Sequence, residues 1–598
     1  MLKRTISRMM LKLLLVSTLA LAFNIQPVKA EPRTWTVDDD GPADFNTIQD
    51  AIKNSSVGDT VFVHIGVYYE NVVINKSILL VGENRSSTII YGNRTSTIVY
   101  VNADNVQICS FTIEGNGSQI RGIYLEYSRN GTIKENYVKN SGFYGILLDR
   151  SDACNVGDNI VNNVTNGISI VVSRNCNISK NQISDCYYGL SLLDTGVCFL
   201  RQNNMTNNQR NFKVTGITVT DFIHDIDFSN TINGKPICYL VNQHDKLVST
   251  NVSFVGVINS TNITVENSEI SHNMWGIILA YTDNSLIRNV TLTLNDYGIR
   301  MLHSKYCIIS ESNVTNNSYI GIALDHSNNC HFLSNNMCNS RSGIYLRNSD
   351  YCTISRNYVN TNGTYGMYLE NCSYCIISEN KIENNYDGIA LHHSNCSSIY
   401  HNMFLNNTKE AYCHDSTNNW DNGFEGNFWS NYDGADTDYD GIGNSHYEID
   451  ENNIDQHPLM GMFLGFNTPY GYQVNFISNS SISDIEFGLI DSFNATLTFN
   501  VTGDAETRGF CRICIPKVLI NGSYIVRFNG VINYSQVREL SCSNETYEYL
   551  YINYSHDKQR IEISGTTMIP EFPLFIIMPM LMIATILAVI SYKRRHSN

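Results

Sequence analysis

The chain has 598 residues, 42% of them hydrophobic, and its 56 aspartates and glutamates outnumber 40 lysines and arginines. This acidic balance, with no basic patch and no interleaving of basic and aromatic residues, argues against nucleic acid as a partner. Length alone suggests about four domains, but internal repeats take precedence over that estimate.

Residues 1–30 read as a secretory signal peptide. A basic start precedes an apolar run from Leu13 to Phe23 and a small-residue cleavage site at residues 28–30. The remaining chain is therefore expected to be exported. Its Asn-x-Ser/Thr sequons, such as those at Asn84 and Asn371, would then be able to carry glycans.

Residues 31–115 are predicted to form an N-terminal capping helix and the first turns of a repeat fold. Ile48, Ala51 and Ile52 have the spacing of one apolar helix face, and an alternating strand pattern follows. A helix laid over the first turn would cover an open sheet edge, which otherwise invites aggregation.

A repeat of 22–23 residues dominates residues 116–460. Each unit holds three short segments of alternating hydrophobicity separated by Asn, Ser and Gly turns, which is a strand pattern. Such triplets bury their apolar faces only by stacking, so we predict a right-handed parallel β-helix. A leucine-rich repeat has a similar period, but its consensus is absent. The repeats align on Gly122, Gly145, Gly167, Gly189, Gly276, Gly298, Gly321, Gly343, Gly366 and Gly388.

Two residue types recur at fixed positions of this repeat and are interpreted as structural. Asparagine stands 14 residues after the aligned glycine in eight units, where stacked amides would satisfy turn groups: Asn136, Asn159, Asn181, Asn203, Asn335, Asn357, Asn380 and Asn402. Cysteine stands nine residues after it in seven units: Cys154, Cys176, Cys198, Cys307, Cys330, Cys352 and Cys375. The thiols are expected to point inward as small apolar fillers.

Residues 211–262 depart from the register of the repeat. Their "DFIHD" (residues 221–225) resembles the "DFIFG" of pectin methylesterases, but Asp225 replaces the glycine and the other motifs of that family are missing. An esterase is therefore not predicted.

His303 and His326 occupy the same turn position on adjacent repeats. Stacking would bring the two imidazoles close together, and imidazole suits copper or zinc. We predict a soft-metal site at this pair. The alternative is that turn positions simply favour residues such as Asn and His.

Residues 427–457 are predicted to be an Asp-rich loop that terminates the β-helix. Asp436, Asp438 and Asp440 alternate as in a calcium loop, with the Ile442 carbonyl and Asn444 as further ligands. The flanks are not helical, so this is not an EF-hand. Structural Ca²⁺ and a solvated loop of Asx turns both remain open.

The repeat ends before residue 461. Residues 461–567 alternate with period two between turns, which predicts a small β-sandwich. No residue from Phe572 to Ile590 is charged, so residues 570–592 are predicted to be a transmembrane anchor, and the basic tail at 593–598 places that end in the cytoplasm. The sequence thus predicts a membrane-anchored protein at the cell surface.

Four blocks in order resemble archaeal NosD-like proteins: "DFNTIQDAI" with "GVYYE", "NGKPICYLVNQ", the repeated "GIxL" motif, and "NFWSNYDGADTDYDGIGNSHYEI". "PEFP" before the apolar stretch resembles the C-terminal sorting signals of archaeal surface proteins. The NosD resemblance implies an exported β-helix and, as a family property, copper as a ligand.

Two functional classes remain open. The first is a surface module that binds polysaccharides or cell-envelope glycans, or scaffolds envelope components. The second is a carbohydrate-active β-helix enzyme: a lyase, hydrolase or epimerase. Such an enzyme needs neighbouring outward acids, and Glu126, Asp149 and Asp325 lie at outward positions. No arginine or lysine is expected to recur beside them, so the binding module is favoured.

Overall fold

The computed structural model describes residues 31–93, 96–249, 251–491, 494–556 and 559–567, together with residues 9, 10 and 12. The chain forms two compact units, residues 1–204 (unit 1) and 205–598 (unit 2). The predicted anchor at 570–592, the tail, and nearly all of the signal peptide lie outside the described residues. Within the described part, no helix is both long enough and apolar enough to cross a membrane.

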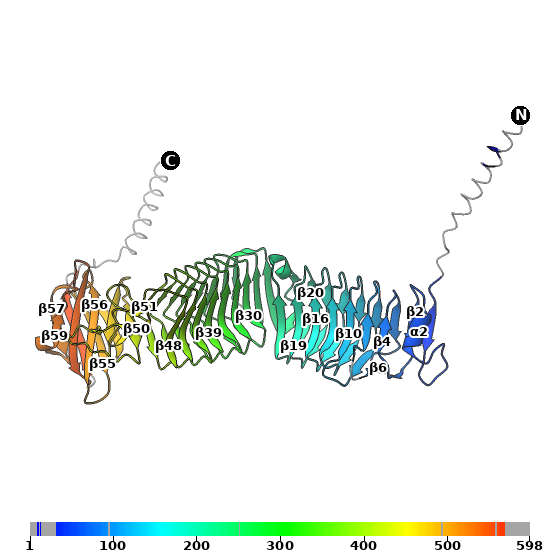
Figure 1. Ribbon diagram of the computed structural model, residues 1–598, viewed down its shortest axis with the longest axis horizontal. Helices are drawn as coiled ribbons and strands as arrows, with labels where there is room; N and C mark the ends of the chain where they lie inside the picture. The colour runs from blue at the N-terminus through cyan, green and yellow to red at the C-terminus, as the bar shows by residue number, and fades with distance from the viewer. Residues whose placement is uncertain are drawn as a thin grey trace, which may run out of the picture. The chain divides into compact units, whose positions relative to one another are not determined.

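A short helix opens the fold of unit 1, as the sequence predicts. Helix α2 (Ile48–Asn54) packs on the first strands at the blue end of the ribbon (Figure 1). The Thr47 hydroxyl accepts a hydrogen bond from the third helical N–H, and the Glu70 carboxylate accepts from the first two. These bonds satisfy donors that have no partner within a helix. The buried face consists of Ile48, Ala51 and Ile52.

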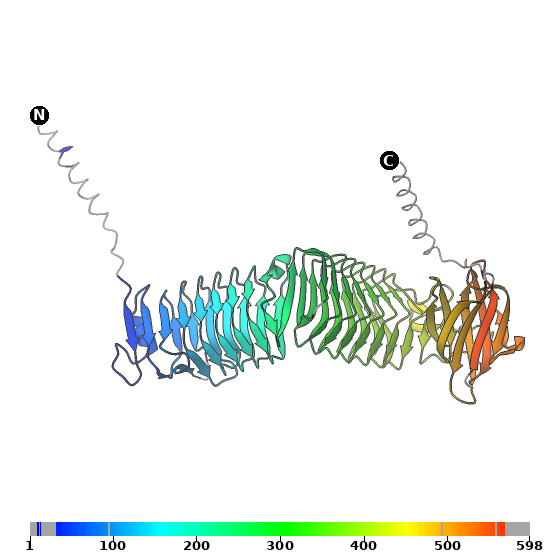
Figure 2. The ribbon, with the colours of Figure 1, turned by 180° about the vertical axis from the view of Figure 1, so that it is seen from behind.

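Three parallel sheets wind through unit 1, one strand of each per turn (Figures 1 and 2). The first contains β1 (Thr34–Val37), β2 (Thr60–Val63), β5 (Leu79–Gly82), β8 (Gln107–Cys109), β11 (Thr132–Lys134), β14 (Asn155–Gly157), β17 (Asn177–Ser179) and β20 (Phe199–Arg201). The second contains β3 (Gly66–Tyr68), β6 (Thr88–Gly92), β9 (Thr112–Gly115), β12 (Tyr137–Lys139), β15 (Ile160–Asn162) and β18 (Gln182–Ser184). The third contains β4 (Val72–Ile74), β7 (Val99–Val101), β10 (Arg121–Glu126), β13 (Tyr144–Asp149), β16 (Asn166–Val171) and β19 (Tyr188–Leu193).

Unit 2 begins with less regular elements and then repeats the three-sheet pattern. The early elements are β21 (Asn204–Thr206), β22 (Arg210–Thr215), η1 (Val219–Phe222), β23 (Asp225–Ile226) and β24 (Thr231–Ile232). One sheet contains β25 (Lys235–Val241), β27 (Phe254–Ile258), β30 (Trp275–Ala280), β33 (Tyr297–Leu302), β36 (Ile320–Asp325), β39 (Ser342–Arg347), β42 (Tyr365–Glu370), β45 (Asp387–His392) and β48 (Lys409–His414). The next contains β26 (His244–Val248), β28 (Thr261–Glu266), β31 (Leu286–Arg288), β34 (Ile308–Ser310), β37 (His331–Leu333), β40 (Thr353–Ser355), β43 (Ile376–Ser378) and β46 (Ser398–Tyr400). The third contains β29 (Glu269–Ser271), β32 (Thr291–Thr293), β35 (Asn313–Thr315), β38 (Asn336–Cys338), β41 (Tyr358–Asn360), β44 (Lys381–Glu383), β47 (Met403–Leu405) and β49 (Phe428–Trp429).

Parallel pairing between successive turns confirms the predicted parallel β-helix. The asparagine ladder is confirmed as well. The Asn159 side chain, for example, accepts from the backbone N–H of Asn136 at 3.0 Å and donates to the Ile133 carbonyl at 2.9 Å. The seven repeated cysteines are buried, as predicted. The interior of each turn is thus filled and hydrogen-bonded by the repeat itself.

Stacked aromatic rings close the far end of the β-helix in unit 2. Phe404 lies parallel to Trp429 at 4.5 Å between ring centroids, and Tyr447 covers Trp429 at 4.2 Å. A hairpin of β50 (Tyr447–Asp450) and β51 (Asn453–Asp455) follows. The Asp455 carboxylate accepts a hydrogen bond from the Trp429 indole at 2.9 Å.

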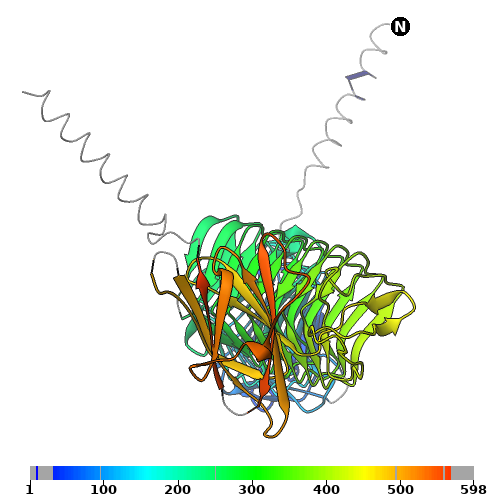
Figure 3. The ribbon, with the colours of Figure 1, turned by 90° about the vertical axis from the view of Figure 1, so that its left-hand side faces the viewer.

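Residues 462–566 of unit 2 form two antiparallel five-stranded sheets around one apolar core (Figure 3). The first has the order β52 (Met462–Asn467), β53 (Gln473–Ser478), β56 (Arg508–Pro516), β60 (Tyr547–Ser555), β59 (Val537–Glu539). The second has the order β54 (Ser481–Leu489), β55 (Asn494–Thr502), β61 (Gln559–Thr566), β57 (Asn521–Phe528), β58 (Val531–Ile532). A short 3-10 helix, η2 (Tyr534–Gln536), precedes β59.

Candidate functional sites

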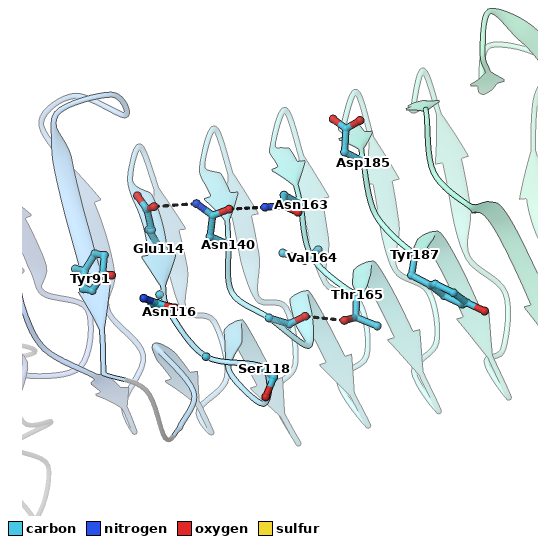
Figure 4. Close-up of a pocket in the computed structure, with 13 residues that line it drawn as sticks. Tyr91, Glu114, Asn116, Ser118, Asn140, Asn163, Val164, Thr165, Asp185 and Tyr187 are labelled. Atoms are coloured by element: carbon cyan, nitrogen blue, oxygen red, sulfur yellow. Dashed lines mark hydrogen bonds between the residues drawn. The ribbon is translucent and has the colours of Figure 1, made fainter.

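The turns from the second to the third sheet of unit 1 form an open groove of about 660 Å³ (Figure 4). Five successive turns of the β-helix contribute to it, so the groove runs along the stack. Its lining consists of Tyr91, Glu114, Gly115, Asn116, Gly117, Ser118, Asn140, Gly142, Asn163, Val164, Thr165, Asp185 and Tyr187.

Side-chain amides and carboxylates form a row along one wall of this groove. Asn163 Nδ2 donates to Asn140 Oδ1 at 2.8 Å, and Asn140 Nδ2 donates to Glu114 Oε1 at 2.9 Å (Figure 4). Asn140 and Asn163 both have positive φ, a conformation that asparagine tolerates well. The same residues therefore suit the tight turn and present fixed donors and acceptors to the groove.

Tyrosines lie at the two ends of the row, and the charge between them is acidic. Tyr91 lies at one end, and Tyr187, whose side chain is 40% exposed, lies at the other (Figure 4). Glu114 and Asp185 are the acids, and Lys139 pairs with Glu114 at 3.1 Å. Neither lysine nor arginine occurs among the described residues that line the groove.

Gly142 allows the longer turn at residues 116–120 to form the opposite wall. Its φ is +72°, and a Cβ at this position would lie 1.9 Å from the carbonyl oxygen of Gly117. Any larger residue would push that turn away, so the shape of the groove depends on this one glycine.

Glu126 and Asp149 lie opposite each other on β10 and β13, as the sequence predicts. Both carboxylates are engaged by neighbours. Glu126 accepts from the Tyr100 hydroxyl at 2.6 Å, and Asp149 accepts from Arg150 at 3.2 Å. A pair of acids on one face is present, but each acid already has a hydrogen-bond donor beside it.

The third predicted outward acid, Asp325, lies in a cleft of about 430 Å³ in unit 2. Arg347 Nε lies 3.2 Å from Asp325 Oδ1, and Arg300 Nη2 lies 3.4 Å from Asp325 Oδ2. The expectation that no basic residue would stand beside this acid is therefore wrong. Arg300 and Arg347 occupy different positions of their repeats, so aligning the repeats on one position does not reveal that they converge. Burial raises the pKa of Asp325, but the two guanidinium groups hold it below its usual value.

His303 and His326 come together in this cleft as stacked rings. Their centroids are 4.9 Å apart with planes at 25°, and Tyr281 stacks on His303 at 4.7 Å. His326 Nδ1 lies 2.8 Å from Asp325 Oδ1. Imidazole lone pairs lie in the ring plane, so rings stacked in this way do not aim at one shared ion. The pair does not fit a copper ion unless a ring turns, and the predicted soft-metal site stays a prediction.

The Asp-rich loop brings its three acids together. Oxygens of Asp436, Asp438 and Asp440 lie within 4.8 Å of one another. Asn444 Nδ2 donates to Asp438 Oδ1 at 2.9 Å, and the Ile442 N–H donates to Asp440 Oδ1 at 2.8 Å. All three carboxylates thus accept hydrogen bonds within the loop, and calcium at this loop stays a prediction.

Two arginines of the 462–566 sheets contact the same loop. Arg512 Nη1 donates to the Asp440 carbonyl at 2.9 Å and lies 3.6 Å from Asp440 Oδ2. Arg538 Nη2 donates to the Tyr439 carbonyl at 2.8 Å. These contacts give the loop a structural role between the last turns of the β-helix and the two sheets.

The sequence analysis did not bring together a third group of candidate ligands, His393, His414 and Asp415. The three side chains offer ligand atoms within 4.8 Å of one another, on adjacent turns of unit 2. The repeat spacing could have revealed this group, because His414 follows His392 by 22 residues, which is one repeat, and pairs with it in register.

Comparison with solved structures gives distant similarities. A tailspike protein of E. coli bacteriophage HK620 in complex with pentasaccharide has a TM-score of 0.32 and 10% identity, covering 87% of this chain and 89% of that one. The A-module of the Azotobacter vinelandii mannuronan C-5 epimerase AlgE4 has a TM-score of 0.25 and 13% identity, covering 56% and 88%. A pectin methylesterase from carrot has a TM-score of 0.21 and 14% identity, covering 53% and 85%.

Among curated proteins, none matches the chain. A family model described as periplasmic copper-binding protein (NosD) matches residues 52–237 and 228–434. The two matches together span more than half of the chain and most of its parallel turns. The chain therefore belongs to the NosD family of β-helical proteins.

Proposed function

We propose that this protein is an extracytoplasmic binding module whose β-helix holds glycans of the cell envelope or its surroundings. The groove of unit 1 is its ligand site. The observation that carries the proposal is the row of Glu114, Asn140 and Asn163, with exposed tyrosine at its end. Fixed amides and carboxylates suit sugar hydroxyls, and tyrosine offers a rigid apolar face with a polar tip.

The charge of the groove favours a neutral oligosaccharide. Lys139 offsets the charge of Glu114, but Asp185 would repel uronates and sulfated sugars, since no lysine or arginine is among the described lining residues. Rungs ~4.8 Å apart also place equivalent groups at a regular spacing, which suits a chain of repeated sugar units.

A glycan array on the purified protein, followed by calorimetry with the best neutral ligand, tests this proposal. Tyr187→Ala should weaken binding about tenfold, which corresponds to about 1.4 kcal/mol. Phe199→Ala is the matched control, because Phe199 is 39% exposed and lies on the first sheet of the same unit. Binding of only acidic glycans, or equal losses in both variants, would contradict the assignment.

A carbohydrate-active enzyme is the alternative function, and Glu126 and Asp149 are the observation in its favour. A lyase, hydrolase or epimerase would change a polysaccharide that the binding module leaves intact. If the protein releases reducing ends or unsaturated products from a polysaccharide, and Glu126→Gln abolishes that release, the enzyme is supported and the binding module is rejected.

The proposed location is the cell surface, with residues 570–592 as a membrane anchor and residues 593–598 in the cytoplasm. The uncharged stretch and its basic flank support this part of the proposal. Removing residues 570–598 should release the protein into the medium. An unchanged membrane fraction would contradict the anchor.

Metal handling is the second property proposed, since the family is described as copper-binding. For the predicted pair, the double variant His303→Ala with His326→Ala should lower copper stoichiometry. An unchanged stoichiometry would remove that pair, whose stacked rings need to reorient before sharing an ion.

A further inference from the structure

We infer that His393, His414 and Asp415 form a binding site for one divalent transition-metal ion on the outer edge of unit 2. His393 directly follows β45, while His414 ends β48 and Asp415 follows it. The register pairs His392 with His414, so His393 and Asp415 occupy equivalent places on adjacent turns. All three side chains are exposed and accessible to an ion from solvent.

The distances match shared metal coordination better than direct hydrogen bonding. His393 Nδ1 and His414 Nε2 both lie 3.6 Å from the same oxygen, Asp415 Oδ2. That distance is too long for a hydrogen bond. Ligands ~2.0–2.1 Å from a tetrahedral ion are separated by roughly 3.3 Å. Small rotations of exposed side chains would close the remaining gap.

The ring orientation also permits convergence. The His393 and His414 rings meet at 63° with centroids 5.7 Å apart, so their in-plane lone pairs can point toward one ion. His303 and His326 are stacked at 25°, and one of them is held by a hydrogen-bond distance of 2.8 Å to Asp325. The His393–His414 pair can therefore share one ion, whereas the stacked His303–His326 pair cannot do so without reorienting.

Aromatic neighbours position the His414 ring from the other side. His392 lies 5.4 Å from His414 and contacts Tyr368 at 5.0 Å and Tyr412 at 5.5 Å, measured between ring centroids. His392 thus adds a further imidazole beside the His414 ligand.

Two imidazoles and one carboxylate define the class of ion. This donor set suits Zn²⁺ and Cu²⁺, whereas Ca²⁺ and Mg²⁺ prefer all-oxygen ligands. Three protein ligands would leave one position open to water or to a further ligand. The site is separate from the groove of unit 1, and its failure would leave the proposed glycan binding untouched.

Titration of the full-length protein with Zn²⁺, and separately with Cu²⁺, tests the inference. The double variant His393→Asn with His414→Gln should lose one bound ion per chain, or weaken that step at least tenfold. Asparagine suits position 393 because Asn348 and Asn371 share its positive φ. Asp415→Asn should weaken the same step less, since it leaves both imidazoles in place.

Matched controls separate this site from adventitious binding. His244→Ala removes an exposed imidazole with its own carboxylate neighbour, Asp245 at 2.8 Å, and should leave the stoichiometry unchanged. With Cu²⁺, electron paramagnetic resonance should show coupling to imidazole nitrogen that disappears in the double variant. Full stoichiometry and an unchanged spectrum in the double variant would overturn the site, as would ion loss shared with His244→Ala. The thermal midpoint of the apo double variant should equal that of the wild type, because both positions are exposed.

Discussion

Asn159 and Asn163 carry the same amide four residues apart, yet they occupy opposite environments. Asn159 is fully buried in the ladder and bonds to the turns on either side of it. Asn163 is exposed and lines the groove. The interior amide is committed to holding the turns together, while the outer amide retains surface for a ligand. The comparison teaches that the repeat fixes the inside of each turn and leaves the outer edge free to vary.

The largest loss of stability is expected from a substitution in the interior of the β-helix. Asn159→Ala removes the partners of Asn136 and of the Ile133 carbonyl and should destabilise unit 1 by about 3–4 kcal/mol. Asn155→Ala, an exposed position in the same turn, should change stability by less than about 0.5 kcal/mol. Denaturant unfolding measures both. Similar losses in the two variants would break the distinction between interior and edge.

A buried acid at the closing end of the β-helix should give a pH dependence. Burial raises the pKa of Asp455 to about 6 from its usual 3.8. The folded chain then binds this proton more tightly than the unfolded chain, so the free energy of unfolding falls as pH rises from about 4 to 6. We expect a loss of about 2–3 kcal/mol across that range.

Asp455→Asn should abolish this slope, because the variant has no proton to release. Thermal midpoints measured between pH 4 and pH 7 would show it. A wild-type midpoint that rises steadily through pH 4–6, with the same rise in Asp455→Asn, would contradict the assignment.

A smaller effect is expected at the wall of the groove. Gly142→Ala forces a side chain into a position with positive φ and against the Gly117 carbonyl, so we expect about 2 kcal/mol of destabilisation and weaker glycan binding. At Gly157, a Cβ would meet its nearest atom at 3.4 Å, and Gly157→Ala should leave both properties unchanged. Calorimetric measurement of stability and glycan binding in the two variants distinguishes displacement of the 116–120 turn from a general effect of replacing a glycine.

The smallest effect concerns the Asp-rich loop. If Asp436, Asp438 and Asp440 bind Ca²⁺, the ion at ten times its dissociation constant should add about 1.4 kcal/mol of stability. The thermal midpoint should then rise with Ca²⁺ and fall back with EDTA. An unchanged midpoint would leave the loop held by its own hydrogen bonds and by Arg512.

The sequence predicts the interior of this fold well, because every turn of the β-helix needs the same kinds of residue at its buried positions. The asparagine ladder and the apolar positions follow directly from a 22–23-residue period. The capping helix is predicted for the same reason, since Ile48, Ala51 and Ile52 form one buried face.

The outer edge is less predictable, because its chemistry depends on side chains from different repeat positions. Arg300 and Arg347 reach Asp325 from two neighbouring turns, and no single aligned position contains both. Histidines at equivalent positions also differ in ring orientation, since His326 is held by Asp325 while His393 faces Asp415. The groove depends further on one longer turn resting on Gly142.

Hydrogen–deuterium exchange of the full-length protein, with and without its best neutral oligosaccharide, tests the central claim most directly. The account predicts slower exchange upon binding in residues 114–118, 140–142, 163–165 and 185–187, which form the groove. The interior strands should exchange at the same rate in both states. Protection confined to the cleft around Asp325, or no protection anywhere at saturating ligand, would contradict the assignment of glycan binding to unit 1.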